Sequence, residues 1–284
     1  MLTVQSSSRE STLRSLDRLP RLSPLFLRLV GLVAQTESTV SEVADVVERD
    51  ALLSAQILER ANSAAFSRVQ PIHSVRHAVA MLGVGVIRRF ALGASLASVF
   101  RNHRIPPGFS FGRFNLHTVA AGTLAEILAE EMRLPRPDSA FAAGLLHDIG
   151  KLLIAGHMPA VYENVLGIQF VSGRPILQCE RELLGADHAE ISAMAISRWD
   201  LEASIVHAAR YHHEPELAPE GDRVLARVVH TADAFVNYLG MSVLPPRGPQ
   251  TESPPLDIQG FNVPVARVTE RFQGEIATLK NLLR

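Results

Sequence analysis

The chain has 284 residues, of which 47% are hydrophobic and 20% are charged, and its formal net charge is −1. This composition is typical of a globular protein and gives no general attraction to nucleic acid or anionic membranes, so we expect no direct DNA binding and no membrane association. The polar N-terminus lacks a signal-peptide core, no apolar run approaches the ~20 residues that span a bilayer, and a single cysteine, Cys179, suits a cytoplasmic protein.

The N-terminal part of the chain shows several helix starts. Residues 1–18 are predicted to be a flexible lead-in, and residues 19–114 a module of about five helices. Ser23 before Pro24, a Thr39–Glu42 capping box, Asp50 and Ser74 mark the helix starts, and Gly83 and Gly85 precede a long apolar segment over 86–100. Strand-like alternation is scarce, so the predicted fold class is all-α.

A proline- and glycine-rich stretch, 101–114, is predicted to join this module to a second helical module over residues 115–240. We expect helices over 116–132 and 138–155, the second capped by Asp138, and then a looser stretch around 167–173. Later helix starts are predicted at Asp187 with Glu190, at Asp200 and at Asp222. Residues 241–284 are predicted to form a proline-rich linker and a C-terminal amphipathic helix over 264–283, which either packs on the body or contacts a partner.

A histidine–aspartate pair, His147 and Asp148, lies inside the apolar segment FAAGLLHDIGKLLI. Both side chains are costly to bury without partners, and together they offer a nitrogen and an oxygen ligand to a divalent metal ion. Lys151 lies four residues after His147, so we expect the two to share a helix face. The pair therefore predicts a buried metal or catalytic site.

Five further positions can complete such a site, although each has a plainer interpretation. His212 and His213 can complement the negative end of a helix, His188 can be a solvated residue at a helix start, and His117 can be a satisfied core histidine. Asp233 is harder to explain in this way, because it lies among valines and alanines and needs a partner. The order of all seven residues along the chain indicates a metal-site ancestry.

The order His117, His147–Asp148, Asp233 resembles the HD superfamily of metal-dependent phosphohydrolases. That resemblance implies one metal ion bound by these four residues, with Lys151 assisting at a phosphate and Asp148 taking part in catalysis. His188, His212 and His213 resemble the second-metal positions of HD-GYP cyclic-di-GMP phosphodiesterases. Two features depart from that subfamily: no Gly-Tyr-Pro signature follows Glu214, and Arg113 stands where those enzymes carry an acidic ligand.

The segments VERDALLSAQILERANSAAF, IHSVRHAVAMLG, GLLHDIGKLL and GADHAEISAMAISRW more closely resemble the HDOD (HD-related output domain) family, over residues 19–240. This resemblance implies an N-terminal helical module packed on an HD-like module, in a bacterial signal-transduction regulator or scaffold without demonstrated hydrolysis. It also implies signalling proteins as partners and a link to cyclic-di-GMP networks.

Three hypotheses for the function follow. The first is a non-catalytic regulator, and the second a metal-dependent phosphohydrolase using Fe, Mn, Zn or Mg. The third is a receptor that binds a cyclic dinucleotide or metal without turnover. Arg104 and Arg113 in the junction can bind a nucleotide phosphate. Arg88 and Arg89 either contact an acidic partner or a phosphate, or form a solvated face. The regulator is preferred, with the enzyme as the alternative.

Overall fold

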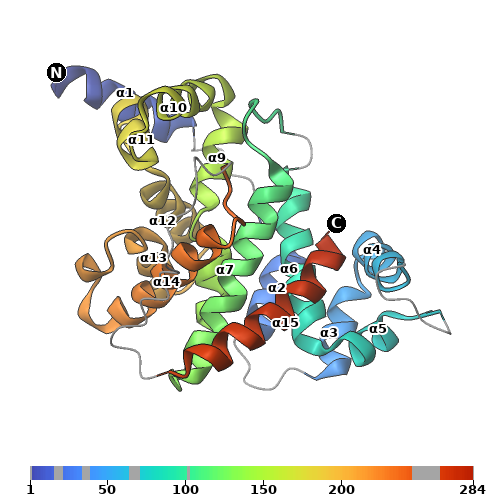
Figure 1. Cartoon of the computed structure of the whole chain (residues 1–284). Coiled ribbons are helices and arrows are strands. Elements are labelled where there is room, and N and C mark those ends of the chain that lie inside the picture. Colours follow the sequence, from blue (N-terminus) through green and yellow to red (C-terminus); the bar gives the residue numbers. More distant parts are fainter. Residues whose placement is uncertain are drawn as a thin grey trace.

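The computed structural model describes residues 2–15, 22–33, 39–63, 71–100, 103–244 and 263–283, and these are helical with no strand among them. The N-terminal helices are α1 (Leu2–Ser15), α2 (Pro24–Val33), α3 (Val40–Val47), α4 (Ala51–Ala61), α5 (Val75–Leu82) and α6 (Val84–Phe100). Helices α2 to α6 lie at one side of the molecule, whereas α1 lies apart from them, beside residues 176–184 (Figure 1).

The second group of helices is built around α7, which runs through the centre of the molecule (Figure 1). Helices α8, α14 and α15 pack on α7, and α12 packs on both α9 and α13. The bounds are α7 (Phe111–Glu131), α8 (Pro137–Leu146), α9 (Ile149–His157), α10 (Pro159–Ser172), α11 (Ile176–Leu184), α12 (His188–Arg198), α13 (Ala203–Tyr211), α14 (Arg223–Tyr238) and α15 (Val265–Leu283), with short 3-10 turns η2 (Pro215–Leu217) and η3 (Glu220–Asp222). The all-α prediction is confirmed.

Local capping chemistry fixes several helix starts where the sequence predicts them. The Ser23 hydroxyl accepts from the Phe26 amide at 3.0 Å, and Thr39 and Glu42 form the reciprocal capping box of α3. Asp50 and Ser74 cap α4 and α5 through the amides three residues later. A turn at Gly83, with φ of 95°, then bends the chain by 120° into α6, which begins at Val84 rather than after Gly85.

The C-terminal helix α15 packs back on the body, which is the first of the two alternatives predicted for it. Its buried face consists of Val268, Phe272, Ile276, Leu279 and Leu282. It crosses α7 and contacts α6 and α4, so it lies over the boundary between the N-terminal helices and the helices around α7 (Figure 1). The proline-rich linker predicted before it falls mainly on residues 245–262, outside the described part of the chain.

Four predictions of local structure are wrong. Residues 2–15 form α1 instead of a flexible lead-in, because Arg9 donates to the Gly185 carbonyl at 2.9 Å and pairs with Glu190. The segment 167–173 is helical up to Ser172, since Gly167 is tolerated inside α10. Asp200 does not cap α13, whose N-cap is Glu202; instead Asp200 takes a left-handed conformation with φ of 57°.

The fourth wrong prediction concerns the helix over 138–155, which is two helices, α8 and α9, separated at His147 and Asp148. Its N-cap is Arg136, and Asp138 lies in the first turn. By length and composition alone Pro137–His157 could cross a membrane, but 89% of its most apolar window is buried inside the protein. The only other candidate in the described chain is the α5–α6 pair, if it is counted as one bent span. The segment is therefore the central core of this fold.

Arg88 and Arg89, which the sequence suggested as surface or ligand-binding residues, are 8% and 4% exposed. Both guanidinium groups pair with Glu126 of α7, and Arg89 forms a two-pronged contact with its Oε2 at 2.9 and 2.6 Å. Arg88 also lies 3.3 Å from Asp138 of α8, and Arg89 pairs with Glu275 of α15. The two arginines thus join α6 to three other helices by buried ion pairs.

Candidate metal centre

The His147–Asp148 pair lies in the turn where α8 ends and α9 begins, and neither side chain is exposed. Small residues allow this turn to sit deep in the core. A Cβ on Gly150 would lie 2.1 Å from the His188 carbonyl oxygen, and a Cβ on Gly144 would lie 2.7 Å from the Gly122 Cα. Glycine therefore permits α9 to approach α12, and α8 to approach α7, closely enough to bring their side chains together.

A first group of metal-binding donors forms around Asp148 Oδ2. His117 of α7 and Asp233 of α14 join His147 and Asp148, and one ligand atom from each lies within 4.8 Å of the others. His117 Nε2 lies 3.2 Å from Asp233 Oδ1 and 3.4 Å from Asp148 Oδ2, and His147 Nε2 lies 3.5 Å from each of the same two oxygens. This two-histidine, two-carboxylate group suits a divalent transition metal.

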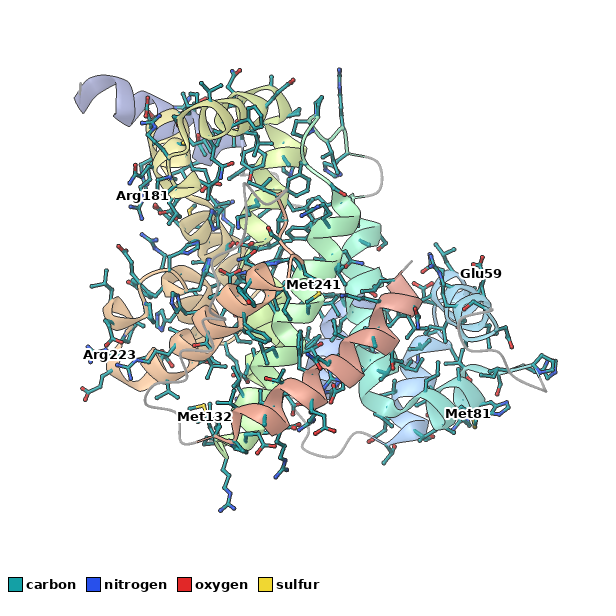
Figure 2. The ribbon with its side chains drawn as sticks, viewed as in Figure 1. Glu59, Met81, Met132, Arg181, Arg223 and Met241 are labelled. Carbon is teal, nitrogen blue, oxygen red and sulfur yellow. The ribbon has the colours of Figure 1, made fainter. Side chains whose placement is uncertain are left out.

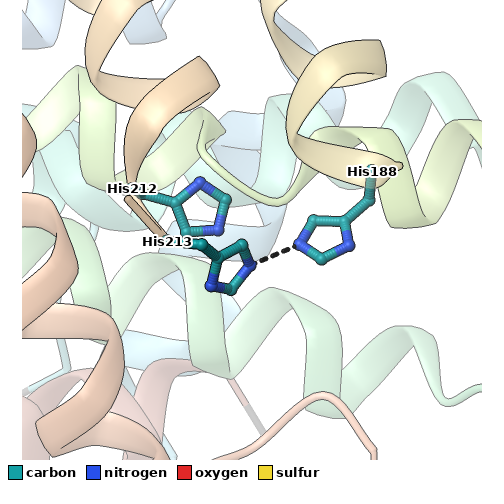
Figure 3. A group of neighbouring side chains, drawn as sticks. All are labelled: His188, His212 and His213. Carbon is teal, nitrogen blue, oxygen red and sulfur yellow. Dashed lines mark hydrogen bonds between the residues drawn. The ribbon is translucent and has the colours of Figure 1, made fainter. Parts of the chain in front are cut away.

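A second group of donors forms on the other side of Asp148. His188 begins α12, while His212 and His213 follow the last residue of α13, and the three imidazoles point toward one another (Figure 3). His188 Nε2 lies 2.9 Å from His213 Nε2 and 3.3 Å from Asp148 Oδ1, and His212 Nε2 lies 3.7 Å from the same oxygen. The two oxygens of Asp148 therefore face the two groups, which is the arrangement of a bridging carboxylate between two ions.

The ligand histidines are held in fixed orientations by bonds from their Nδ1 atoms. Such bonds leave Nε2 free for a metal and set the tautomer of the ring. The acceptors are Met241 O for His117 at 3.0 Å, Gly144 O for His147 at 2.7 Å, Ala209 O for His212 at 2.8 Å and Glu180 Oε2 for His188 at 2.7 Å. Met241, labelled near the centre of Figure 2, follows α14 and so links the end of that helix to the site.

Two buried atoms at the centre that can each bind a metal ion show that these residues fit a metal. Asp148 Oδ1 and His212 Nε2 are buried and have no hydrogen-bond partner. Leaving such atoms unpaired is costly in a protein interior, and a cation between them removes that cost. The donor set is one that divalent ions such as zinc or iron prefer.

The buried charges also shift the ionisation of the site. Burial raises the pKa of Asp148, but Lys151 and His147 more than offset this and hold it well below its usual value. Burial lowers the pKa of His117, yet its hydrogen bonds to Asp148 and Asp233 raise it to about 9. Burial, together with His188 and Lys151, lowers the pKa of His213 to about 3. The two carboxylates are thus ionised and His213 is neutral at neutral pH, as metal ligands must be, whereas His117 is protonated and would release its proton when a metal binds.

Lys151 does not share a helix face with His147 as a continuous helix would require, because the helix is broken between them. Its Nζ donates to Asp148 Oδ2 at 2.6 Å, and the residue is 9% exposed. Lys151 is therefore a counter-ion of Asp148 inside the protein.

The two junction arginines differ in their surroundings. Arg113 donates from Nε to the Ser242 carbonyl at 3.0 Å and from Nη2 to the Leu244 carbonyl at 3.2 Å, so it holds the chain's own backbone after α14. Arg113 therefore points to this backbone segment rather than to the metal centre. Arg104 is exposed in the loop before α7.

Sequence reasoning missed two residues that support the ligands. Glu180 of α11 is fully buried and binds His188, and Asn237 of α14 donates to Asp233 Oδ1 at 2.8 Å. The signal for Asn237 is its spacing, four residues after Asp233 on one helix. Glu180 lies in the amphipathic segment ILQCERELL, where its position on the buried face is the only trace of its role.

Comparisons with known proteins agree with this architecture. The chain resembles the crystal structure of an HDOD domain protein of unknown function from Geobacter sulfurreducens, with 22% identity, a TM-score of 0.77 and coverage of 99% of both chains. It also resembles a candidate signal transduction protein from Marinobacter aquaeolei VT8, with 22% identity, a TM-score of 0.74 and coverage of 98% of this chain and 64% of that one. A candidate phosphohydrolase from Shewanella amazonensis SB2B is 25% identical, with a TM-score of 0.70 and coverage of 95% and 97%.

A curated relative, an uncharacterized protein from Treponema pallidum (strain Nichols), is 21% identical over 230 residues, which are 79% of this chain and 43% of the relative. The chain thus spans less than half the length of that relative. The HDOD domain family model matches residues 19–215, which include the N-terminal helices and six of the seven candidate ligands. The chain therefore belongs to the HDOD domain family.

Proposed function

We propose that this protein is a signal-transduction regulator of the HDOD type, with divalent metal bound at the two donor groups around Asp148. The observation that carries the proposal is the bridging position of Asp148, whose two oxygens face separate groups of oriented histidines. Five imidazoles in the combined set favour zinc or iron over manganese and magnesium, which prefer oxygen ligands and water.

A regulatory role accounts better than catalysis for the basic residues. A phosphohydrolase needs cationic side chains that hold the substrate phosphates. Here Arg88 and Arg89 are committed to Glu126, Arg113 holds backbone carbonyls, and Lys151 is bonded to Asp148. We infer that the metal centre stabilises one arrangement of α9, α12 and α14, and that bacterial signalling proteins in the cytoplasm recognise the outer helix surfaces. A cyclic dinucleotide is the small-molecule ligand that we propose to test at the centre.

Metal-dependent phosphohydrolysis is the second candidate, and the complete donor set favours it. When bound, divalent ions supply Lewis acidity toward a phosphoryl oxygen. The chain's own contribution would come from Lys151, whose ammonium lies beside the bridging carboxylate and can neutralise phosphate charge if it exchanges partners. Asp148 would hold the two ions at a fixed separation.

The deciding experiment measures metal per chain by mass spectrometry, followed by hydrolysis of bis-p-nitrophenyl phosphate and of cyclic di-GMP. Wild type, purified without chelator, is compared with Asp148→Asn, which preserves side-chain volume, and with His77→Ala, an exposed histidine of α5 that serves as the matched control. We expect one to two ions per chain in wild type and in the control, loss of metal in Asp148→Asn, and no turnover. Metal-free wild type would refute the metal centre, and turnover that Asp148→Asn abolishes would replace the regulator by the enzyme.

A further inference from the structure

Glu180 is a fully buried carboxylate outside both donor groups. Its Oε2 accepts two hydrogen bonds from a single residue, from the His188 backbone amide at 2.9 Å and from the His188 Nδ1 at 2.7 Å. Glu180 belongs to α11 and His188 begins α12, and the two helices are joined by a tight turn in which Gly185 has φ of 69°. The turn returns the chain so that a side chain eight residues earlier reaches the first turn of α12.

This contact distinguishes His188 from the other oriented histidines of the site. His117, His147 and His212 direct Nδ1 to backbone carbonyls, which are neutral acceptors. His188 instead faces an acidic side chain. A carboxylate bonded to one nitrogen of an imidazole makes the other nitrogen a more basic ligand and fixes its direction toward the metal.

The second donor group has particular need of such a partner. It contains three imidazoles, His188, His212 and His213, and its one carboxylate oxygen comes from Asp148, which also serves the first group. The first group has a carboxylate of its own in Asp233. A divalent ion in the second group would therefore contact fewer carboxylates than one in the first group. Glu180, a buried anion that contacts the ligand His188, would compensate for part of this difference in charge.

We propose that Glu180 is a positioning residue that acts through His188 to set the affinity of the second donor group for a nitrogen-preferring divalent ion such as Zn²⁺ or Co²⁺. This inference rests on the metal centre of the proposed function. It predicts different effects on the two ions: the affinity of the first donor group does not depend on Glu180, whereas the affinity of the second does.

A plainer role for Glu180 is to cap α12, because its carboxylate also accepts the His188 amide at the N-terminus of that helix. The experiment must therefore distinguish a ligand-positioning role from a structural one. Glu180→Gln retains the shape of the side chain and an acceptor oxygen but removes the charge, whereas Glu180→Ala removes both. Glu163→Gln, at an exposed position of α10, is the matched control.

The metal-free proteins are titrated with Co²⁺, which reports on each site through its visible absorption and by calorimetry, and their unfolding temperatures are compared. We expect two Co²⁺ per chain in wild type and Glu163→Gln. In Glu180→Gln the first Co²⁺ should bind as in wild type, and the dissociation constant of the second should rise about 10- to 100-fold. Glu180→Ala should bind only one ion in the accessible concentration range.

The outcomes separate the two proposals. If wild type binds no Co²⁺, the proposed metal centre fails, and Glu180 has no ion to act on. If wild type binds two ions and Glu180→Gln binds both with unchanged affinity, the metal centre stands and the role of Glu180 is refuted. A lowered unfolding temperature of metal-free Glu180→Gln with unchanged Co²⁺ affinities identifies Glu180 as a helix cap alone, which also refutes the inference.

Discussion

Glu126 offers the sharpest test of how the N-terminal helices are joined to the HD-like helices. The residue is 2% exposed and accepts hydrogen bonds from both Arg88 and Arg89. Replacing it by glutamine keeps the volume and one acceptor oxygen, but it leaves two buried guanidinium groups with too little negative charge. Removal of one partner from a buried ion pair costs about 3–5 kcal/mol.

The structure places the expected cost of Glu126→Gln at the lower end of that range. Arg88 still has Asp138 at 3.3 Å, and Arg89 still has Glu275 of α15. We therefore expect a loss of about 3 kcal/mol in the free energy of unfolding, which corresponds to a fall in the unfolding temperature of roughly 6–12 °C for a chain of this size.

The assay is thermal and urea unfolding of chelator-treated protein, followed by circular dichroism. Glu130→Gln is the matched control, because Glu130 lies one turn later on α7 and pairs with Arg271 at 2.5 Å, but its side chain is 37% exposed. An exposed pair of this kind contributes less than about 1 kcal/mol. Equal losses in the two variants would show that Glu126 is not a buried junction residue and would refute the reasoning.

Two further predictions concern packing and pH. Gly150→Ala should lower the free energy of unfolding by about 1–3 kcal/mol and weaken binding of the second Co²⁺, because its Cβ would lie 2.1 Å from the His188 carbonyl oxygen. The control is Gly167→Ala in α10, whose Cβ would meet nothing within 4 Å and which should be neutral or slightly stabilising. Equal effects of the two substitutions in calorimetry would contradict this prediction. Burial raises the pKa of Asp138 to about 6; Arg88 opposes this shift, and Glu126 and Glu130 add to it. The folded state therefore holds the proton of Asp138 more tightly than the unfolded state does. The stability that Asp138 contributes in its protonated form is lost as pH rises through 6. In urea unfolding, the stability of Asp138→Asn relative to wild type should therefore increase as pH rises from 4.5 to 7.5. A stability difference that is independent of pH would argue against the raised pKa.

The helix starts were predictable where the capping atoms are close in sequence. Ser23, Thr39, Asp50 and Ser74 each accept from an amide three residues later, so the sequence contains both partners. The failures arise where distant contacts decide. Helix α1 is held by Arg9 on the turn at Gly185, and no local pattern in the first 15 residues contains that contact.

The ligands of the candidate metal centre were identifiable for a chemical reason. His147, Asp148 and Asp233 interrupt apolar helical patterns, and a charged or polar residue in such a place needs a partner. The break between α8 and α9 was not predictable, because the apolar periodicity continues through Leu145, Ile149 and Leu152. Hydrogen bonds from imidazoles to backbone carbonyls, such as that from His117 to Met241, were not predictable either, because any residue type can supply the carbonyl.

Two buried polar clusters among the described residues differ in a way that the sequence does not reveal. In the first, Arg88 and Arg89 meet Glu126, Asp138 and Glu275, so opposite charges compensate one another and the cluster needs no ligand. In the second, the Nε2 atoms of His117 and His147 face each other at 3.4 Å and Asp148 Oδ1 has no partner. Lys151 compensates part of the charge of Asp148, but Asp148 Oδ1 and His212 Nε2 are buried acceptors without a hydrogen-bond partner. These unpaired acceptors, rather than burial alone, are the reason for assigning ligand binding to the second cluster and structure to the first.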